Sequence, residues 1–176
     1  MRLALTCHPD TPCEAVRSIE VDVQRHSGRL ALHYALRGDV GLVAWPEGVS
    51  GERTNELWKH TCFEAFVRVD DRPAYLELNF APSGEWASYH FDDYRAGMRI
   101  ADDIIAPPFE AFGIGERYDL RAAADLRGPD QHLPWRLALS AVIEETNGAK
   151  SYWALRHPPG KPDFHHADSF AYELQP

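Results

Sequence analysis

The chain has 176 residues, of which 44% are apolar and 11% aromatic, and its 27 acidic and 18 basic residues give a formal net charge of −9. This length and apolar content suit one domain with a hydrophobic core, and they exclude a disordered tail, a collagen-like fibre and a disulfide-stapled miniprotein. Nucleic acids and anionic membranes attract basic surfaces, so neither is an expected partner. We expect a single domain over residues 1–176, and the oligomeric state stays open.

The N-terminal residues indicate a cytoplasmic protein. Only Leu-Ala-Leu separates Arg2 from Thr6, whereas the apolar region of a secretory signal has roughly 7–15 residues. No apolar run approaches the ~20 residues of a membrane-spanning helix. Cys7, Cys13 and Cys62 form no C-x-x-C pair, which favours free thiols in a reducing compartment.

Apolar residues alternate with polar ones in many short segments, which is typical of strands. Two of these segments flank His26-Ser27-Gly28, a hairpin signal. The predicted strands, in chain order, are 17–25, 28–37, 61–70, 75–80, 85–91, 117–124, 135–144, 151–156 and 169–174. Their number and spacing predict an all-β fold, an antiparallel β-sandwich. Residues 92–116 lack this alternation and are expected to form a long, partly helical loop.

Catalytic and nucleotide-binding motifs are missing from the sequence. It contains no phosphate-binding loop, no H-E-x-x-H and no G-x-S-x-G. Cys62 lies two residues from both His60 and Glu64, but alternate strand residues point the same way rather than holding a base against a nucleophile. We therefore assign no catalytic residue.

One strand face combines an aromatic ring with polar groups. If Phe63 and its alternate neighbours face the core, the opposite face carries Trp58, His60, Cys62, Glu64, Phe66 and Arg68, and the next strand adds Tyr75, Glu77 and Asn79. The strand after that adds either Trp86, Ser88 and His90 or Ala87, Tyr89 and Phe91. Aromatic rings beside planar hydrogen-bonding groups suit a sugar. The alternatives are a solvated face and a face covered by 92–116.

A second cluster of candidate residues surrounds a Pro/Gly-rich segment near the C-terminus. It contains His157, Lys161, Asp163, Phe164 and His165. Such a segment is either a binding loop or a rigid connection, and we expect the nearby Trp153 to pack in the core. Several residues of both clusters are acceptable metal ligands, but none has the spacing of a metal site. No metal ligand is assigned.

Two blocks of the sequence carry a family resemblance. Residues 57–98 contain LWKHTCFEAFV and AYLELNF followed by a Ser-Gly turn and an aromatic strand, and residues 153–166 read WALRHPPGKPDFHH. The first block resembles the DOMON-like superfamily and, within it, domains related to the family-9 carbohydrate-binding modules. The second is similar to a bacterial, mostly cytoplasmic branch of poorly defined function.

The resemblance implies a β-sandwich and a site that holds a sugar between two tryptophans. Trp58 and Glu64 match the first tryptophan and an acidic sugar contact, and Asn79 or Arg68 supplies the next polar group. For the second tryptophan, the candidates are Trp153, Trp86 and Phe164. Other members of the superfamily bind haem through a methionine and a histidine, which here implies Met98 with His157 or His165.

The sequence thus predicts a non-catalytic module that binds a small carbohydrate or a sugar-derived metabolite, without a cofactor. The predicted site consists of Trp58, His60, Glu64, Arg68, Asn79, His157, Lys161, Asp163, Phe164 and His165. Two alternatives stay open at this point. One is a haem- or metal-binding domain of the DOMON type, and the other is a hydrolase or isomerase that uses Glu64 and His60.

Overall fold

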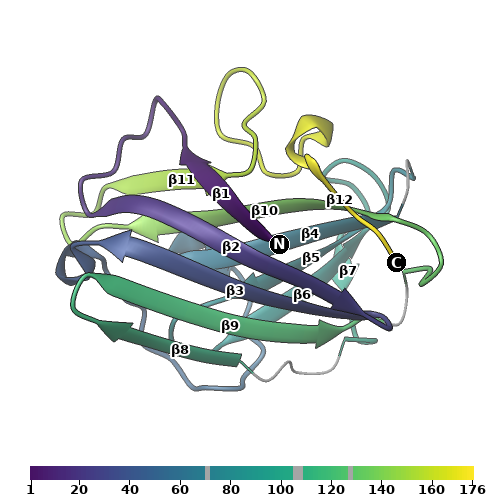
Figure 1. The fold of residues 1–176 in the computed structure, drawn as a ribbon, viewed down its shortest axis with the longest axis horizontal. Coiled ribbons are helices and arrows are strands. Elements are labelled where there is room, and N and C mark those ends of the chain that lie inside the picture. The colour runs from purple at the N-terminus through teal and green to yellow at the C-terminus, as the bar shows by residue number, and fades with distance from the viewer. Residues whose placement is uncertain (70–71, 105–108, 127–128) are drawn as a thin grey trace.

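The computed structural model describes residues 1–69, 72–104, 109–126 and 129–176, and for Phe109 only the backbone. Strands dominate the chain (Figure 1). They are β1 (Arg2–Cys7), β2 (Val16–His26), β3 (Arg29–Gly38), β4 (Cys62–Val69), β5 (Tyr75–Phe80), β6 (Trp86–Phe91), β7 (Arg99–Ile100), β8 (Phe109–Ile114), β9 (Arg117–Asp125), β10 (Trp135–Glu144), β11 (Lys150–Ala154) and β12 (Tyr172–Leu174).

The strands form two antiparallel sheets. The first sheet has the order β8-β9-β3-β2-β1, and the second has the order β7-β6-β5-β4-β10-β11, with β12 also paired to β10. Strand β1 belongs to both, because Leu3 pairs with Val21 of β2 whereas Cys7 pairs with Trp153 of β11. The two sheets are therefore joined along one edge, and the predicted antiparallel sandwich is confirmed.

Short helical turns complete the structure. They are the 3₁₀ turns η1 (Val40–Leu42), η2 (Leu57–Lys59) and η3 (Ala167–Ser169). Within the described ranges, no helix has the length and apolarity needed to cross a membrane. The predicted hairpin between β2 and β3 is confirmed: Ser27 and Gly28 both have positive φ, 44° and 81°, as the tightest hairpin turns require.

The prediction of a partly helical loop over 92–116 was wrong. This stretch contains β7 and β8, and its described residues contain no helix; residues 105–108 lie outside the described part. Among the described strands, β8 pairs with β9 alone, at the edge of the first sheet, and its Phe112 and Ile114 are exposed. Because these apolar side chains face solvent, the pattern of buried apolar and exposed polar residues that predicts a strand is missing from β8. The strand predicted over 61–70 corresponds to β4, which ends at Val69; residue 70 lies outside the described residues.

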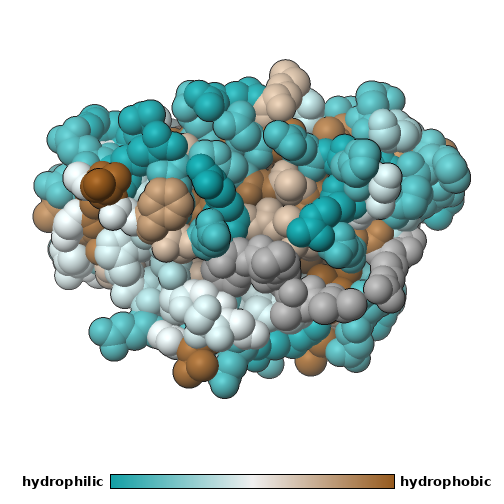
Figure 2. Space-filling view, turned by 60° about the horizontal axis from the view of Figure 1, so that its bottom comes forward, coloured by the Kyte–Doolittle hydropathy of each residue, from teal (hydrophilic) through white to brown (hydrophobic). Residues whose placement is uncertain are grey.

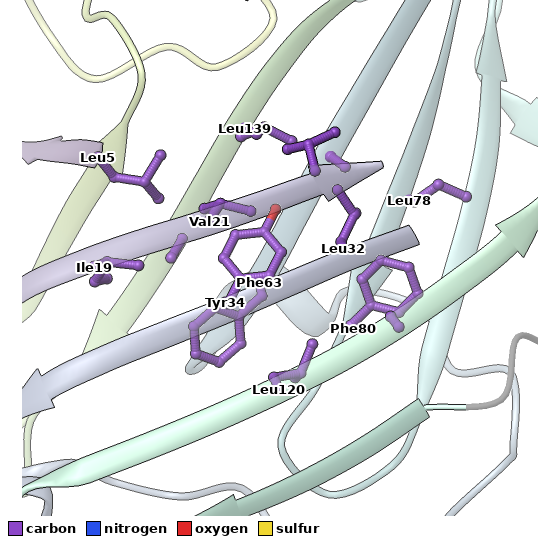
Figure 3. Packing of buried hydrophobic residues seen from close by; sticks show 14 of the residues in the cluster. Leu5, Ile19, Val21, Leu32, Tyr34, Phe63, Leu78, Phe80, Leu120 and Leu139 are labelled. Atoms are coloured by element: carbon purple, nitrogen blue, oxygen red, sulfur yellow. The ribbon is translucent and has the colours of Figure 1, made fainter. Parts of the chain in front are cut away.

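The main core lies between the two sheets (Figure 3). The first sheet contributes Leu5, Ile19, Val21, Leu32, Tyr34 and Leu120, and the second contributes Phe63, Leu78, Phe80 and Leu139. These are the apolar sets of the alternating segments. Trp86, Trp135 and Trp153 are buried in the same core, so the prediction that Trp153 packs there is confirmed.

Removing one buried hydroxyl from this core tests how it holds the second sheet. The Tyr34 hydroxyl donates a hydrogen bond to the Glu64 carbonyl oxygen at 2.6 Å, so Tyr34→Phe leaves that bond unmade. We expect the free energy of unfolding to fall by about 1–2 kcal/mol, measured by urea denaturation. Tyr118→Phe is the control, because the Tyr118 hydroxyl has no hydrogen bond among the described residues. Equal losses in the two variants would contradict this role.

The second sheet is buried on its other face as well. Every residue of β5 is buried, as are residues 62–67 of β4. Leu57, Phe164 and Phe170, from connecting segments, join this second cluster. The ring of Phe170 lies 5.6 Å from that of Tyr75 and 6.4 Å from that of Phe66, centroid to centroid. The face predicted to be polar is therefore covered by chain segments and largely apolar.

Candidate functional site

A cavity of about 330 Å³ lies over the outer face of the second sheet. Strands β4, β5, β6, β10 and β11 supply part of its lining, and the turns around residues 58, 95–98 and 162–165 supply the rest. The lining residues are Trp58, Glu64, Glu77, Phe91, Arg95, Met98, Val142, Tyr152, Pro162, Phe164 and His165. Aromatic and aliphatic side chains thus surround two carboxyl groups, a guanidinium and an imidazole.

The strand register places the two carboxyl groups on one face. Glu64 is opposite Ser140 of β10 and Asn79 of β5, and Glu77 is opposite Phe66 of β4. Glu64 Oε2 accepts a hydrogen bond from Ser140 Oγ at 3.3 Å, and Glu77 Oε1 accepts one from Asn79 Nδ2 at 2.7 Å. Glu64 and Glu77 are only 2% and 4% exposed. Both carboxyl groups therefore depend on few protein donors.

Burial keeps these carboxyl groups partly protonated. It raises the pKa of Glu77 to about 7, since water no longer stabilises the anion. The pKa of Glu64 is raised well above its ordinary value by burial and by the neighbouring Glu77 charge. The two groups therefore share protons near neutral pH rather than both being ionised.

His165 is held as a neutral donor. Burial, reinforced by the Arg95 charge, lowers its pKa to about 4. The Tyr75 hydroxyl accepts a hydrogen bond from the Arg95 backbone N–H and lies 2.8 Å from His165 Nδ1. In the neutral imidazole, the tautomer with its proton on Nε2 accepts the Tyr75 hydroxyl proton at Nδ1. That Nε2 lies 3.9 Å from Glu77 Oε2, a gap that a ligand hydroxyl can bridge.

The rim of the cavity is held by an ion pair. Arg95 donates to Asp163 Oδ1 at 2.9 Å, and the Tyr94 hydroxyl donates to Asp163 Oδ2. Although burial opposes ionisation, the hydrogen bonds from Tyr94 and Arg95 lower the pKa of Asp163. The turn after β6 and the segment before η3 are thereby tied together across the cavity.

Asp163→Asn is expected to loosen this rim without unfolding the protein. The pair is partly exposed, so the free energy of unfolding falls by less than about 1 kcal/mol. Amide hydrogen exchange in residues 93–98 becomes faster, because Tyr94 and Arg95 lose their charged partner. Arg17→Ala, which breaks an exposed pair with Glu116, is the comparison. Unchanged exchange in the Asp163 variant would show that this pair does not hold the turn.

Aromatic rings make the walls of the cavity. Trp58 is half-buried and meets the ring of Tyr89 edge-on at 5.9 Å, centroid to centroid. Phe164 and Tyr152 form the other side, with ring centroids 6.1 Å apart. Since these rings are supported by neighbouring rings, their faces are fixed before a ligand arrives.

Of the predicted site residues, four line this cavity: Trp58, Glu64, Phe164 and His165. Two more touch lining residues, since Asp163 pairs with Arg95 and Asn79 donates to Glu77. The phase of β6 that the sequence left open is also settled: Ala87, Tyr89 and Phe91 share the cavity face. Two segments distant in sequence are thus brought to one place.

The remaining four predicted residues are also absent from the lining. His60 is exposed and hydrogen-bonded to Glu144 at 2.7 Å, and the guanidinium of Arg68 lies over the Phe170 ring. His157 donates to the Thr6 carbonyl oxygen at 2.8 Å, which anchors its segment to β1, and Lys161 is exposed. The proposed Glu64–His60 acid–base pair is therefore not assembled.

The tryptophans offered as a second stacking ring are also elsewhere. Trp86 and Trp153 belong to the main core, because their strands turn them inward, so Phe164 is the remaining candidate of the three. The lining residues absent from the predicted site are Glu77, Phe91, Arg95, Met98, Val142, Tyr152 and Pro162. Glu77 and Phe91 could have been predicted, because the alternation in the sequence placed Glu77 on this face and Phe91 in one of the two alternatives for β6. Arg95 lies in a turn, where no periodic pattern indicates which way a side chain points.

The histidine named for haem ligation in this cavity is engaged by other protein groups. Met98 and His165 both line the cavity, but His165 Nδ1 faces the Tyr75 hydroxyl and Nε2 faces Glu77. Ligation of iron by Nε2 would require the imidazole proton to move to Nδ1 and the hydroxyl to turn away. Among the described residues, no three His, Cys, Asp or Glu side chains gather as a metal site does.

The outer face of the first sheet carries a second, more open hollow of about 820 Å³. Several of its polar groups are paired with residues beside the hollow: His33 lies 2.6 Å from Asp119, and Asp22 binds Arg2 at 3.0 Å. None of its described lining residues is Phe, Tyr or Trp. On the face in Figure 2, hydrophobic residues are scattered among hydrophilic ones rather than gathered as at a protein interface.

Comparison with known proteins bears on the fold. No model of a known protein family matches the sequence, and neither does any curated protein. A solved structure of a candidate carbohydrate-binding protein from Bacteroides uniformis matches with a TM-score of 0.69 and 12% identity, over 99% of this chain and 85% of that one.

Two further solved structures are family-9 carbohydrate-binding modules from Caldicellulosiruptor kristjanssonii. The complex with cellotriose has a TM-score of 0.55 at 9% identity, over 94% of this chain and 82% of that one. The complex with glucose has a TM-score of 0.52 at 9% identity, over 90% and 75%. The chain therefore has the fold of the family-9 carbohydrate-binding modules.

Proposed function

We propose that this chain is a non-catalytic module that binds a small carbohydrate or sugar-derived metabolite in the cavity over the second sheet. The observation that carries the proposal is the cavity itself, where fixed aromatic rings stand around buried carboxyl groups. Its volume is about 330 Å³, at the lower end of the range for small-molecule sites. A monosaccharide, or the end of a short oligosaccharide, suits that space.

The chemistry of the lining matches the two sides of a sugar. The C–H faces of a pyranose pack on Trp58 and Phe164, while its hydroxyls donate to the oxygens of Glu64 and Glu77. His165 Nε2–H offers a donor to a ring or hydroxyl oxygen. The similar folds that bind cellotriose and glucose support the choice of ligand class.

Calorimetric titration with glucose, cellotriose and other saccharides tests the proposal. We expect binding to the wild type and a loss of affinity of at least about tenfold in Trp58→Ala, because the stacking face is removed. His60→Ala is the matched control, since His60 is a near neighbour outside the cavity. A protein that binds none of the saccharides, or an equal effect of the two variants, would contradict the proposal.

Recovery of the ligand separates binding from catalysis. Glu77 and His165 both have shifted pKa values and line the same cavity, which is the arrangement an acid–base enzyme would use. For a module without catalysis, the saccharide recovered after prolonged incubation is unchanged in linkage and ring configuration. A change that disappears in Glu77→Gln would make this chain an enzyme.

A further inference from the structure

The floor of the cavity holds hydrogen-bond acceptors that the protein leaves unsatisfied. Glu64 is 2% exposed, and its Oε1 has no hydrogen-bond partner among the described residues. Its Oε2 has only the 3.3 Å bond from Ser140, and Glu77 Oε2 lies 3.9 Å from Nε2 of the neutral His165 imidazole. A buried acceptor without a donor is costly, so this arrangement points to a ligand that donates several hydrogen bonds at one place.

The described groups around these acceptors carry no net positive charge. The groups that interact with the two carboxyls are Tyr34 on β3, Cys62 on β4, Tyr75 and Asn79 on β5, Tyr89 on β6, Ser140 on β10, Arg95 in the turn after β6 and His165 before η3. Of these groups, Arg95 carries a positive charge, and it already forms an ion pair with Asp163. His165 is neutral, so the floor lacks a positive charge of its own.

We propose that the preferred ligand is an amino sugar whose ammonium group sits on the Glu64–Glu77 pair. This rests on the proposed function, since it names the class of saccharide that the same cavity takes. An ammonium group has three donors and no acceptor, which matches Glu64 Oε1, Glu64 Oε2 and Glu77 Oε2. The aromatic walls add favourable contacts to a cation.

Proton exchange follows from this binding mode. In the free protein, the raised pKa of Glu77, about 7, keeps a proton on the carboxyl pair in weakly acidic solution. An ammonium group favours the ionised carboxylates, so that proton is released to the solvent as the ligand binds. A neutral sugar accepts or shares the proton instead, and its binding releases none.

The experiment is calorimetric titration with D-glucosamine, D-glucose and N-acetyl-D-glucosamine at about pH 6.5, where the amine of glucosamine is protonated, in buffers of different ionisation enthalpy. We expect glucosamine to bind at least about tenfold more tightly than the other two sugars, with proton release. In Glu77→Gln and Glu64→Gln the preference falls to within about twofold, whereas His60→Ala keeps it.

Each other outcome has a distinct meaning. Glucose or N-acetylglucosamine binding as tightly as glucosamine, without proton release, overturns the amino-sugar inference and leaves carbohydrate binding standing. Failure of all three sugars to bind a folded wild-type protein overturns the inference, and a failure that extends to glucose, cellotriose and other saccharides overturns the proposed function as well. A preference for glucosamine that both glutamine variants retain, with unchanged melting curves, also overturns the assignment to this carboxyl pair.

Discussion

Glu77→Gln is expected to raise the free energy of unfolding by about 3 kcal/mol at pH 8, and to change it little at pH 4. The carboxyl group is 4% exposed, and burial raises its pKa to about 7 from an ordinary value of 4.5. Below the ordinary value, both folded and unfolded chains carry the proton. As the pH rises, the unfolded chain loses its proton first, so the wild type becomes less stable until the pH passes the folded value. Glutamine is neutral throughout.

Urea denaturation of the wild type and Glu77→Gln at several pH values measures this difference. Taking the difference between the two proteins cancels carboxyl groups such as Asp119 and Asp163, whose lowered pKa values stabilise the folded state in the opposite direction. His60→Gln, a change at an exposed site, is the control for a glutamine substitution outside the cavity. A difference that is constant between pH 4 and pH 8 would contradict the raised pKa of Glu77.

Phe164→Ala is expected to lower the free energy of unfolding by about 3 kcal/mol and to abolish detectable saccharide binding. The ring is buried in the second cluster, packs near Tyr152 and lines the cavity. Truncation therefore removes apolar contacts in the covering segment and one wall of the proposed site together. Stability is measured by urea denaturation and affinity by calorimetric titration.

Phe164→Leu separates the two effects. Leucine fills much of the space left by alanine, so we expect most of the stability to return, whereas the flat face for a sugar ring stays missing. Saccharide affinity then remains at least about tenfold below that of the wild type. Wild-type affinity in either variant would remove Phe164 from the site.

Alternation was enough to predict most of the fold, because the main core uses one face of each strand. Ile19 and Val21 of β2, for example, are both fully buried between the sheets. Alternation does not predict strands that depart from this one-face burial. Strand β1 divides its six residues between two sheets, and β8 turns Phe112 to solvent.

The site was only partly predictable, because the second sheet is buried on both faces. The sequence carried a sign of this in β4 and β6, where Phe66 and Tyr89 are large rings on the face assigned to polar groups. What it could not show is which connecting segments cover that face. Arg95 and Tyr152 reach the cavity through tertiary packing, while His157, equally plausible by composition, serves to anchor its segment to β1.

The position at which a saccharide binds distinguishes the cavity over the second sheet from the rest of the surface. Of the five tryptophans in the chain, Trp58 lines the cavity, while Trp135 and Trp153 are buried in the main core. In an NMR titration with glucose or glucosamine, we expect the Trp58 indole N–H and the Val142 methyl signals to shift, while those of Trp135 and Trp153 stay in place. Shifts confined to Ala31 and His33 in the hollow of the first sheet, or no shifts with any saccharide, would contradict it.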